Sequence, residues 1–133
     1  MINYPITILT DFGKGSTKYR RQRNDCTVCA VSKAFNMSYV SAHNSFADLG
    51  RKTGKRFRFS AWLVGSPLAK GRFHVLNISY NTTIEEFCKE YRVGRFIIRT
   101  ERPNHVIPIV NGMIYDNRPN KRNKRVVSAW QII

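Results

Sequence analysis

Cys26 is the residue of this chain best suited to chemistry, because it stands where a polar run becomes an apolar one. Residues 22–25 before it are polar and residues 27–31 after it are mostly apolar, the pattern of a loop that turns into a helix. A helix N-terminus presents free backbone N–H groups and the positive end of its dipole. Both favour the thiolate, which is the form of cysteine that attacks carbon or binds metal. A nucleophilic thiol also needs a base, a group that orients the base, and donors for an oxyanion.

His105 and Asp116 are the pair of residues that could supply such a base. His105 opens one apolar stretch, and Asp116 ends the next one, beyond an Asn111-Gly112 pair that is a strong hairpin signal. Counting outwards from this turn puts His105 level with position 118, so both side chains are expected at one end of a sheet. A histidine held by a carboxylate is the base that a cysteine nucleophile requires.

The helices that must position these residues follow from hydrophobic periodicity and capping signals. The first is predicted over 26–36, with Asp25 as a candidate N-cap, and the second from about Ser38 to Leu49. A short helix is expected around 60–64. A further helix over 84–91 follows a Thr82 or Thr83 cap and carries two glutamates in its first turn.

The strands are predicted at the other end of the chain, over 94–100, 105–110, 113–116 and 126–132. N-terminal helices packed against a C-terminal antiparallel sheet define an α+β fold. No repeat, low-complexity tract or domain boundary divides residues 1–133, so we expect a single domain.

Composition narrows the class of protein. The chain is 42% hydrophobic, enough for a core, and no stretch approaches the roughly 18 apolar residues of a membrane span. Residues 1–6 lack the basic flank and apolar run of a signal peptide. The three cysteines are an odd number, which argues against a disulfide framework and favours a reducing compartment. We therefore expect a cytoplasmic protein without membrane contact.

The formal charge of +15 is the second unusual feature. The basic residues cluster in three predicted loops, over 18–23, 51–56 and 118–125. Such loops are either a solvated surface or a contact for nucleic acid or another acidic partner.

The chain resembles the papain-like cysteine peptidases, in which a helix-borne cysteine is followed by a histidine and an acid on consecutive strands. More narrowly, it is similar to small, mostly uncharacterised phage and bacterial members of that fold. Short blocks between about residue 19 and the end carry the resemblance, namely residues 24–28, 38–39, 42–43, 94–97, His105, 111–112, Asp116, Val127 and Trp130.

The resemblance implies a papain-like fold and a thiol hydrolase that cleaves a peptide or isopeptide bond without a cofactor. Cys26 would be the nucleophile, His105 the general base and later acid, and Asp116 the residue that orients His105. Asn117 is the alternative orienter. The Cys26 N–H and a side-chain amide, from Gln22 or from Asn24, would bind the oxyanion. If a phage encodes the chain, the host cytoplasm is the expected location.

The segment over 51–75 would line the cleft of a papain-like enzyme. Its Arg56, Arg58 and Trp62 are substrate-binding candidates, and they favour an acidic or extended peptide. Peptidoglycan cross-links and ubiquitin-like tails remain open as other targets.

Three other interpretations of the sequence are weighed against a hydrolase. Cys26 and Cys29 form a C-x-x-C pair, typical of a redox motif or half a zinc site. A redox motif would follow a strand, but this one follows a polar run. Zinc would need two more ligands among Cys88 and the three histidines, with no second paired motif, so we expect no metal. The third interpretation is a nucleic-acid-binding or inhibitory protein that uses its basic loops on a catalytically inactive papain-like fold.

Overall fold

The computed structural model describes residues 6–133 of the chain. Residues 1–5, which carry most of the segment tested above for a signal peptide, lie outside the described residues. No helix in the described part is long and apolar enough to cross a membrane.

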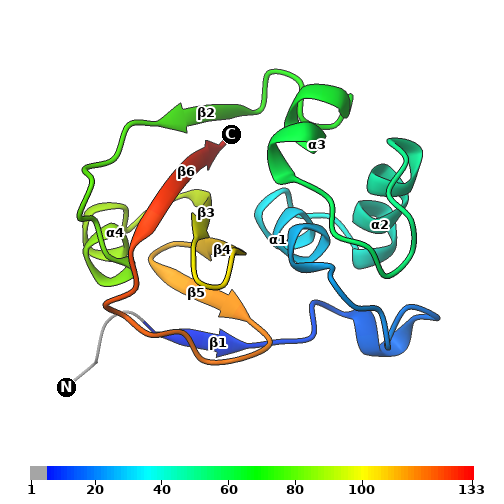
Figure 1. Ribbon diagram of the computed structural model, residues 1–133, viewed down its shortest axis with the longest axis horizontal. Coiled ribbons are helices and arrows are strands. Elements are labelled where there is room, and N and C mark those ends of the chain that lie inside the picture. Colours follow the sequence, from blue (N-terminus) through cyan, green and yellow to red (C-terminus); the bar gives the residue numbers. More distant parts are fainter. Residues whose placement is uncertain (1–5) are drawn as a thin grey trace.

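A six-stranded sheet forms the centre of the molecule, in the order β1-β5-β4-β3-β6-β2 (Figure 1). Its strands are β1 (Thr7–Leu9), β2 (Phe73–Leu76), β3 (Arg95–Thr100), β4 (His105–Val110), β5 (Met113–Asp116) and β6 (Val126–Ile132). The α+β class is confirmed. The expectation of a purely antiparallel, C-terminal sheet is wrong, because β1 pairs in parallel with β5 and β2 precedes the last helix.

The helices are α1 (Cys26–Ala34), α2 (Tyr39–Asp48), α3 (Phe59–Gly65) and α4 (Ile84–Glu90), with a 3-10 turn η1 at Lys14–Ser16. Ser38 caps α2 by accepting a hydrogen bond from the Ser41 N–H. Thr83 forms a capping box with Glu86 at the start of α4. The capping residues in the sequence therefore mark the true starts of these two helices.

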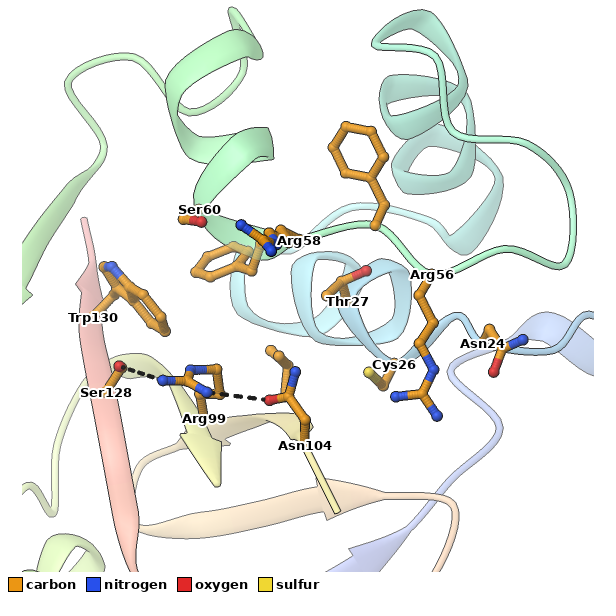
Figure 2. Close-up of a pocket in the computed structure, with 13 residues that line it drawn as sticks. Asn24, Cys26, Thr27, Arg56, Arg58, Ser60, Arg99, Asn104, Ser128 and Trp130 are labelled. Carbon is orange, nitrogen blue, oxygen red and sulfur yellow. Dashed lines mark hydrogen bonds between the residues drawn. The ribbon is translucent and has the colours of Figure 1, made fainter. Parts of the chain in front are cut away.

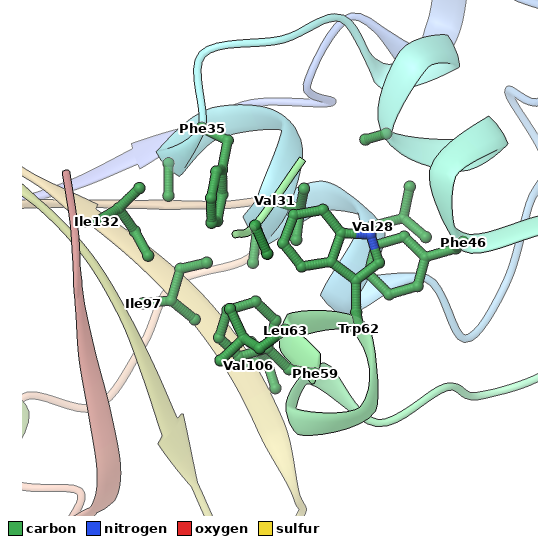
Figure 3. Packing of buried hydrophobic residues seen from close by; sticks show 14 of the residues in the cluster. Val28, Val31, Phe35, Phe46, Phe59, Trp62, Leu63, Ile97, Val106 and Ile132 are labelled. Atoms are coloured by element: carbon green, nitrogen blue, oxygen red, sulfur yellow. The ribbon is translucent and has the colours of Figure 1, made fainter. Parts of the chain in front are cut away.

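The sheet is covered on both faces, with α1, α2 and α3 on one side and α4 on the other (Figure 1). Alternate residues of β3 show this division, since Ile97 packs against the α1–α3 side and its neighbours Phe96 and Ile98 pack on the α4 side. Figure 3 shows the larger cluster, in which Trp62 of α3 lies among side chains of α1, α2 and the sheet.

The β4–β5 hairpin turns at Asn111 and Gly112, which have φ of 51° and 76°. Positive φ at both positions is what an Asn-Gly hairpin turn requires. The register, with Val110 opposite Met113, is the one expected from the sequence. It carries His105 and Asp116 to the same end of the sheet.

Candidate active site

Cys26 is the first residue of α1, and α1 packs against β4. Its sulfur accepts hydrogen bonds from the His105 ring and from the Val106 N–H. Burial raises the pKa of the Cys26 thiol, but these two hydrogen bonds and the charge of His105 outweigh it and hold the pKa below 9.0. The thiolate is therefore favoured at this position.

His105 connects Cys26 to Asp116. Its Nε2 lies 2.8 Å from Asp116 Oδ2. Because a carboxylate only accepts, Nε2 carries the proton, and this leaves Nδ1 as the ring atom for the thiol. Burial lowers the pKa of His105, but the hydrogen bonds to Asp116 and Cys26 and their charges raise it to about 9. The imidazolium form is favoured near neutral pH.

Asp116 ends β5 and is itself held by several donors. Besides His105, the Asn120 side-chain amide donates to Oδ2 at 2.9 Å and the Asn117 backbone N–H donates to Oδ1 at 2.8 Å. Burial raises the pKa of Asp116, but these hydrogen bonds and the His105 charge lower it below its ordinary value. The Asn117 residue is exposed and contributes its backbone alone, so Asp116 is the residue in contact with His105.

Asp25 stands at the N-cap position of α1, but its side chain does not cap the helix. Its carboxylate instead binds Lys14 Nζ at 3.0 Å and the Tyr39 hydroxyl at 2.7 Å. The capping expectation is corrected here, because the partly buried Lys14 and the buried Tyr39 take the carboxylate as their partner in place of the helix N–H groups. Lys14 thereby offsets a negative charge that would otherwise raise the pKa of Cys26.

The two oxyanion-hole candidates occupy different places. Asn24 lines the cleft beside Cys26, and its Nδ2 donates to Gly54 O at 2.9 Å. Gln22 lines neither of the two cavities that border Cys26. Its Oε1 accepts from the Gly54 N–H at 2.6 Å and from Arg51 at 3.2 Å, which ties the loop before α1 to the loop after α2. The first N–H groups of α1, which lack intrahelical acceptors, are the other donors beside the sulfur.

Two cavities meet at Cys26. The first, about 670 Å³, runs between the start of α3 and the strands β3 and β6, and we call it the arginine cleft (Figure 2). The second, about 410 Å³, contains His105 and Asp116, and we call it the histidine cleft. Cys26 thus borders both clefts.

The three substrate-binding candidates differ in whether they line the cavities. Arg56 lines both cavities and Arg58 lines the arginine cleft, and both are exposed. Trp62 is fully buried, and its indole N–H donates to Ser45 Oγ at 2.9 Å. This corrects the expectation for Trp62, whose apolar surface is used by the core of α1–α3. Trp130 of β6 lines the cleft instead.

The remaining cysteines and histidines do not contact His105 or Asp116, although Cys29 lines the histidine cleft. Burial and the Asp25 charge raise the pKa of Cys29, and burial raises the pKa of Cys88 to about 12. His43 is buried and stacks on Tyr19 with ring centroids 3.8 Å apart, and His74 is exposed on β2. Within residues 6–133, no three His, Cys, Asp or Glu side chains are grouped so that they could hold a metal ion.

Four contributors to the site were missed in the sequence. They are the Val106 N–H at the sulfur, the Asn120 amide on Asp116, Lys14 on Asp25, and Arg99 in the arginine cleft. The positions of Arg99 and Val106 can be inferred from the alternation of side chains along β3 and β4 once it is known which face of the sheet Cys26 lies against. Lys14 and Asn120 belong to loops whose residue types give no signal.

No family model, curated protein or solved structure matches this chain.

Proposed function

We propose that the chain is a papain-like cysteine hydrolase that cleaves a peptide or isopeptide bond through Cys26, His105 and Asp116. The observation that carries this proposal is the bridging position of His105, bonded to Asp116 at 2.8 Å and to the thiol at the start of α1. A helix-borne cysteine packed against a sheet, with histidine and acid on consecutive strands, supports the papain-like assignment.

The chemistry follows from these contacts. The Cys26 thiolate attacks the carbonyl carbon, and the negative charge that develops on its oxygen is bound by N–H groups at the start of α1. The His105 imidazolium gives its proton to the departing amine, and the acyl group stays on the sulfur. Neutral His105 then takes a proton from water, which attacks the thioester and releases the acid and the thiolate. Asp116 keeps His105 in the tautomer that both steps need.

Alkylation with iodoacetamide at neutral pH tests the nucleophile, because the chain holds two internal references. Cys26 should be modified much faster than Cys29 and Cys88, whose pKa values are raised. His105→Ala should abolish this selectivity. His74→Ala, at an exposed histidine outside the site, should leave it unchanged. Slow and equal labelling of all three cysteines would contradict the proposal.

Acyl transfer needs a separate measurement, since a reactive thiol alone does not make a hydrolase. With p-nitrophenyl acetate, we expect a burst of p-nitrophenol from acylation of Cys26, followed by steady turnover. A single burst without turnover would show a nucleophilic thiol whose acyl enzyme is not hydrolysed, and the absence of both burst and turnover would indicate a fold that binds rather than cleaves.

The net charge of +15 favours nucleic-acid binding as a second candidate function. It predicts an affinity for DNA or RNA that falls steeply as salt is raised. Binding that does not depend on salt, or no binding at all, would eliminate it.

The three cysteines are free thiols, which suits the reducing cytoplasm that we propose as the location.

A further inference from the structure

The arginine cleft begins at the nucleophile and extends away from it. Arg56 and Arg58 enter it from the loop and cap position before α3, and Arg99 enters from β3 on the opposite, sheet side (Figure 2). Cys26 lies at one end, and Trp130 of β6 lies at the other. Any chain that presents a carbonyl carbon to Cys26 in this direction must place its neighbouring residue between these arginines.

The charged residues that line this cleft are all positive. Three arginines line it, and no aspartate or glutamate does. Within residues 6–133, Arg56 and Arg58 form no salt bridge, so their charges are not balanced by the protein. Three cations around one hollow repel one another, and an anionic ligand would remove that repulsion.

Arg99 is held in place, but its hydrogen-bonding capacity is not used up. Its Nη1 lies 3.4 Å from both Glu101 Oε1 and Asn104 Oδ1, and its Nη2 lies 3.4 Å from Ser128 Oγ. All three contacts are long for a charge-assisted hydrogen bond. Glu101 is half exposed, so it leaves most of the Arg99 charge available to a ligand.

We propose that the arginine cleft binds a substrate residue with a carboxylate side chain, Asp or Glu, adjacent to the bond that is cut. This inference rests on the proposed function, because it takes Cys26 as the point of cleavage. The carboxylate accepts hydrogen bonds from the guanidinium groups of the cleft. Nucleic acid fits less well, since Trp130 is only 9% exposed and offers no open face on which a base could stack.

Binding is measured in a Cys26→Ala background, so that the peptide stays intact and no turnover is required. The probe is a fluorescein-labelled ten-residue peptide of alternating Glu and Ala, compared by anisotropy with its Gln–Ala counterpart. We expect the Glu peptide to bind at least about tenfold more tightly, and Arg58→Gln or Arg99→Gln to weaken it about tenfold each.

The matched control is Arg92→Gln, which removes the same charge from an exposed arginine outside the cleft. It should leave the affinity unchanged. Equal affinity for the Glu and Gln peptides, or an equal loss in Arg92→Gln and Arg99→Gln, would overturn the inference. So would an oligothymidylate of the same length that binds more tightly than the Glu peptide and displaces it. Alkylation of Cys26 is measured independently, so a failure of this inference is distinguishable from a failure of the proposed hydrolase.

Discussion

Replacing Asp116 with asparagine removes one charge from the centre of the site and changes its shape very little. The wild-type carboxylate accepts the Nε2 proton of His105 at 2.8 Å and contributes to raising the pKa of His105 from 6.5 to about 9. That rise corresponds to a preference of about 3 kcal/mol for the imidazolium over a histidine in water. An asparagine oxygen can still accept the hydrogen bond, but it brings no charge.

The consequence for His105 can be worked out at pH 7. With a pKa of about 9, about 99% of His105 is protonated. Without the carboxylate, burial still lowers the pKa of His105 and only Cys26 still raises it, so the pKa of His105 falls and a smaller share of the ring stays protonated. The Cys26 thiolate then loses part of the cationic charge that stabilises it, and its pKa rises.

Iodoacetamide alkylation as a function of pH measures this directly. We expect the midpoint for Cys26 in Asp116→Asn to move up by about one pH unit or more, and the rate at pH 7 to fall by about tenfold or more. Cys29 and Cys88 in the same molecule show whether the substitution has partly unfolded the protein, because unfolding would accelerate their labelling.

The neighbouring asparagine gives the control for this experiment. Asn117→Ala keeps the backbone N–H that binds Asp116, so its profile should match that of the wild type. If the profiles of Asp116→Asn and wild type superimpose, the carboxylate does not tune Cys26, and the electrostatic reasoning fails.

Three further results are expected. Hydrolysis of p-nitrophenyl acetate should fall at low pH as the Cys26 thiolate is protonated, in parallel with the alkylation of Cys26. Lys14→Gln leaves the Asp25 charge unpaired next to the site and should raise the alkylation midpoint of Cys26, so an unchanged midpoint would mean that solvent already screens Asp25. Thr83→Ala breaks the capping box of α4 on the far face of the sheet, and urea unfolding should show a loss of about 1 kcal/mol with Cys26 alkylation at pH 7 unaffected in the folded protein.

Much of the local structure could be predicted because it depends on short-range signals. The Asn111-Gly112 turn sets the register of β4 and β5 by itself, and that register brings His105 to Asp116. The capping residues Ser38 and Thr83 likewise mark helix starts without help from the rest of the fold.

Features that depend on long-range pairing could not be predicted in the same way. The parallel pairing of β1 with β5 joins segments about a hundred residues apart in sequence, and nothing in its three residues identifies the partner. The burial of Trp62 was missed because a tryptophan near a basic loop serves a core or a cleft equally well. Lys14 reaches Asp25 only because β1 brings its segment there.

The segment between β1 and η1 connects the two halves of the site although it supplies neither the thiol nor the base. At one end Leu9 pairs with Asp116, and the Thr10 N–H donates to the Asp116 carbonyl at 2.8 Å. At the other end Lys14 forms an ion pair with Asp25, the residue before the nucleophile. This segment therefore links the backbone of the acid-bearing strand to the start of the cysteine-bearing helix, in addition to the direct packing of α1 on β4. A single proteolytic nick between Leu9 and Lys14 would leave Cys26, His105 and Asp116 on one uncut chain and yet break this link, so the reactivity of the thiol also reports whether the segment is intact.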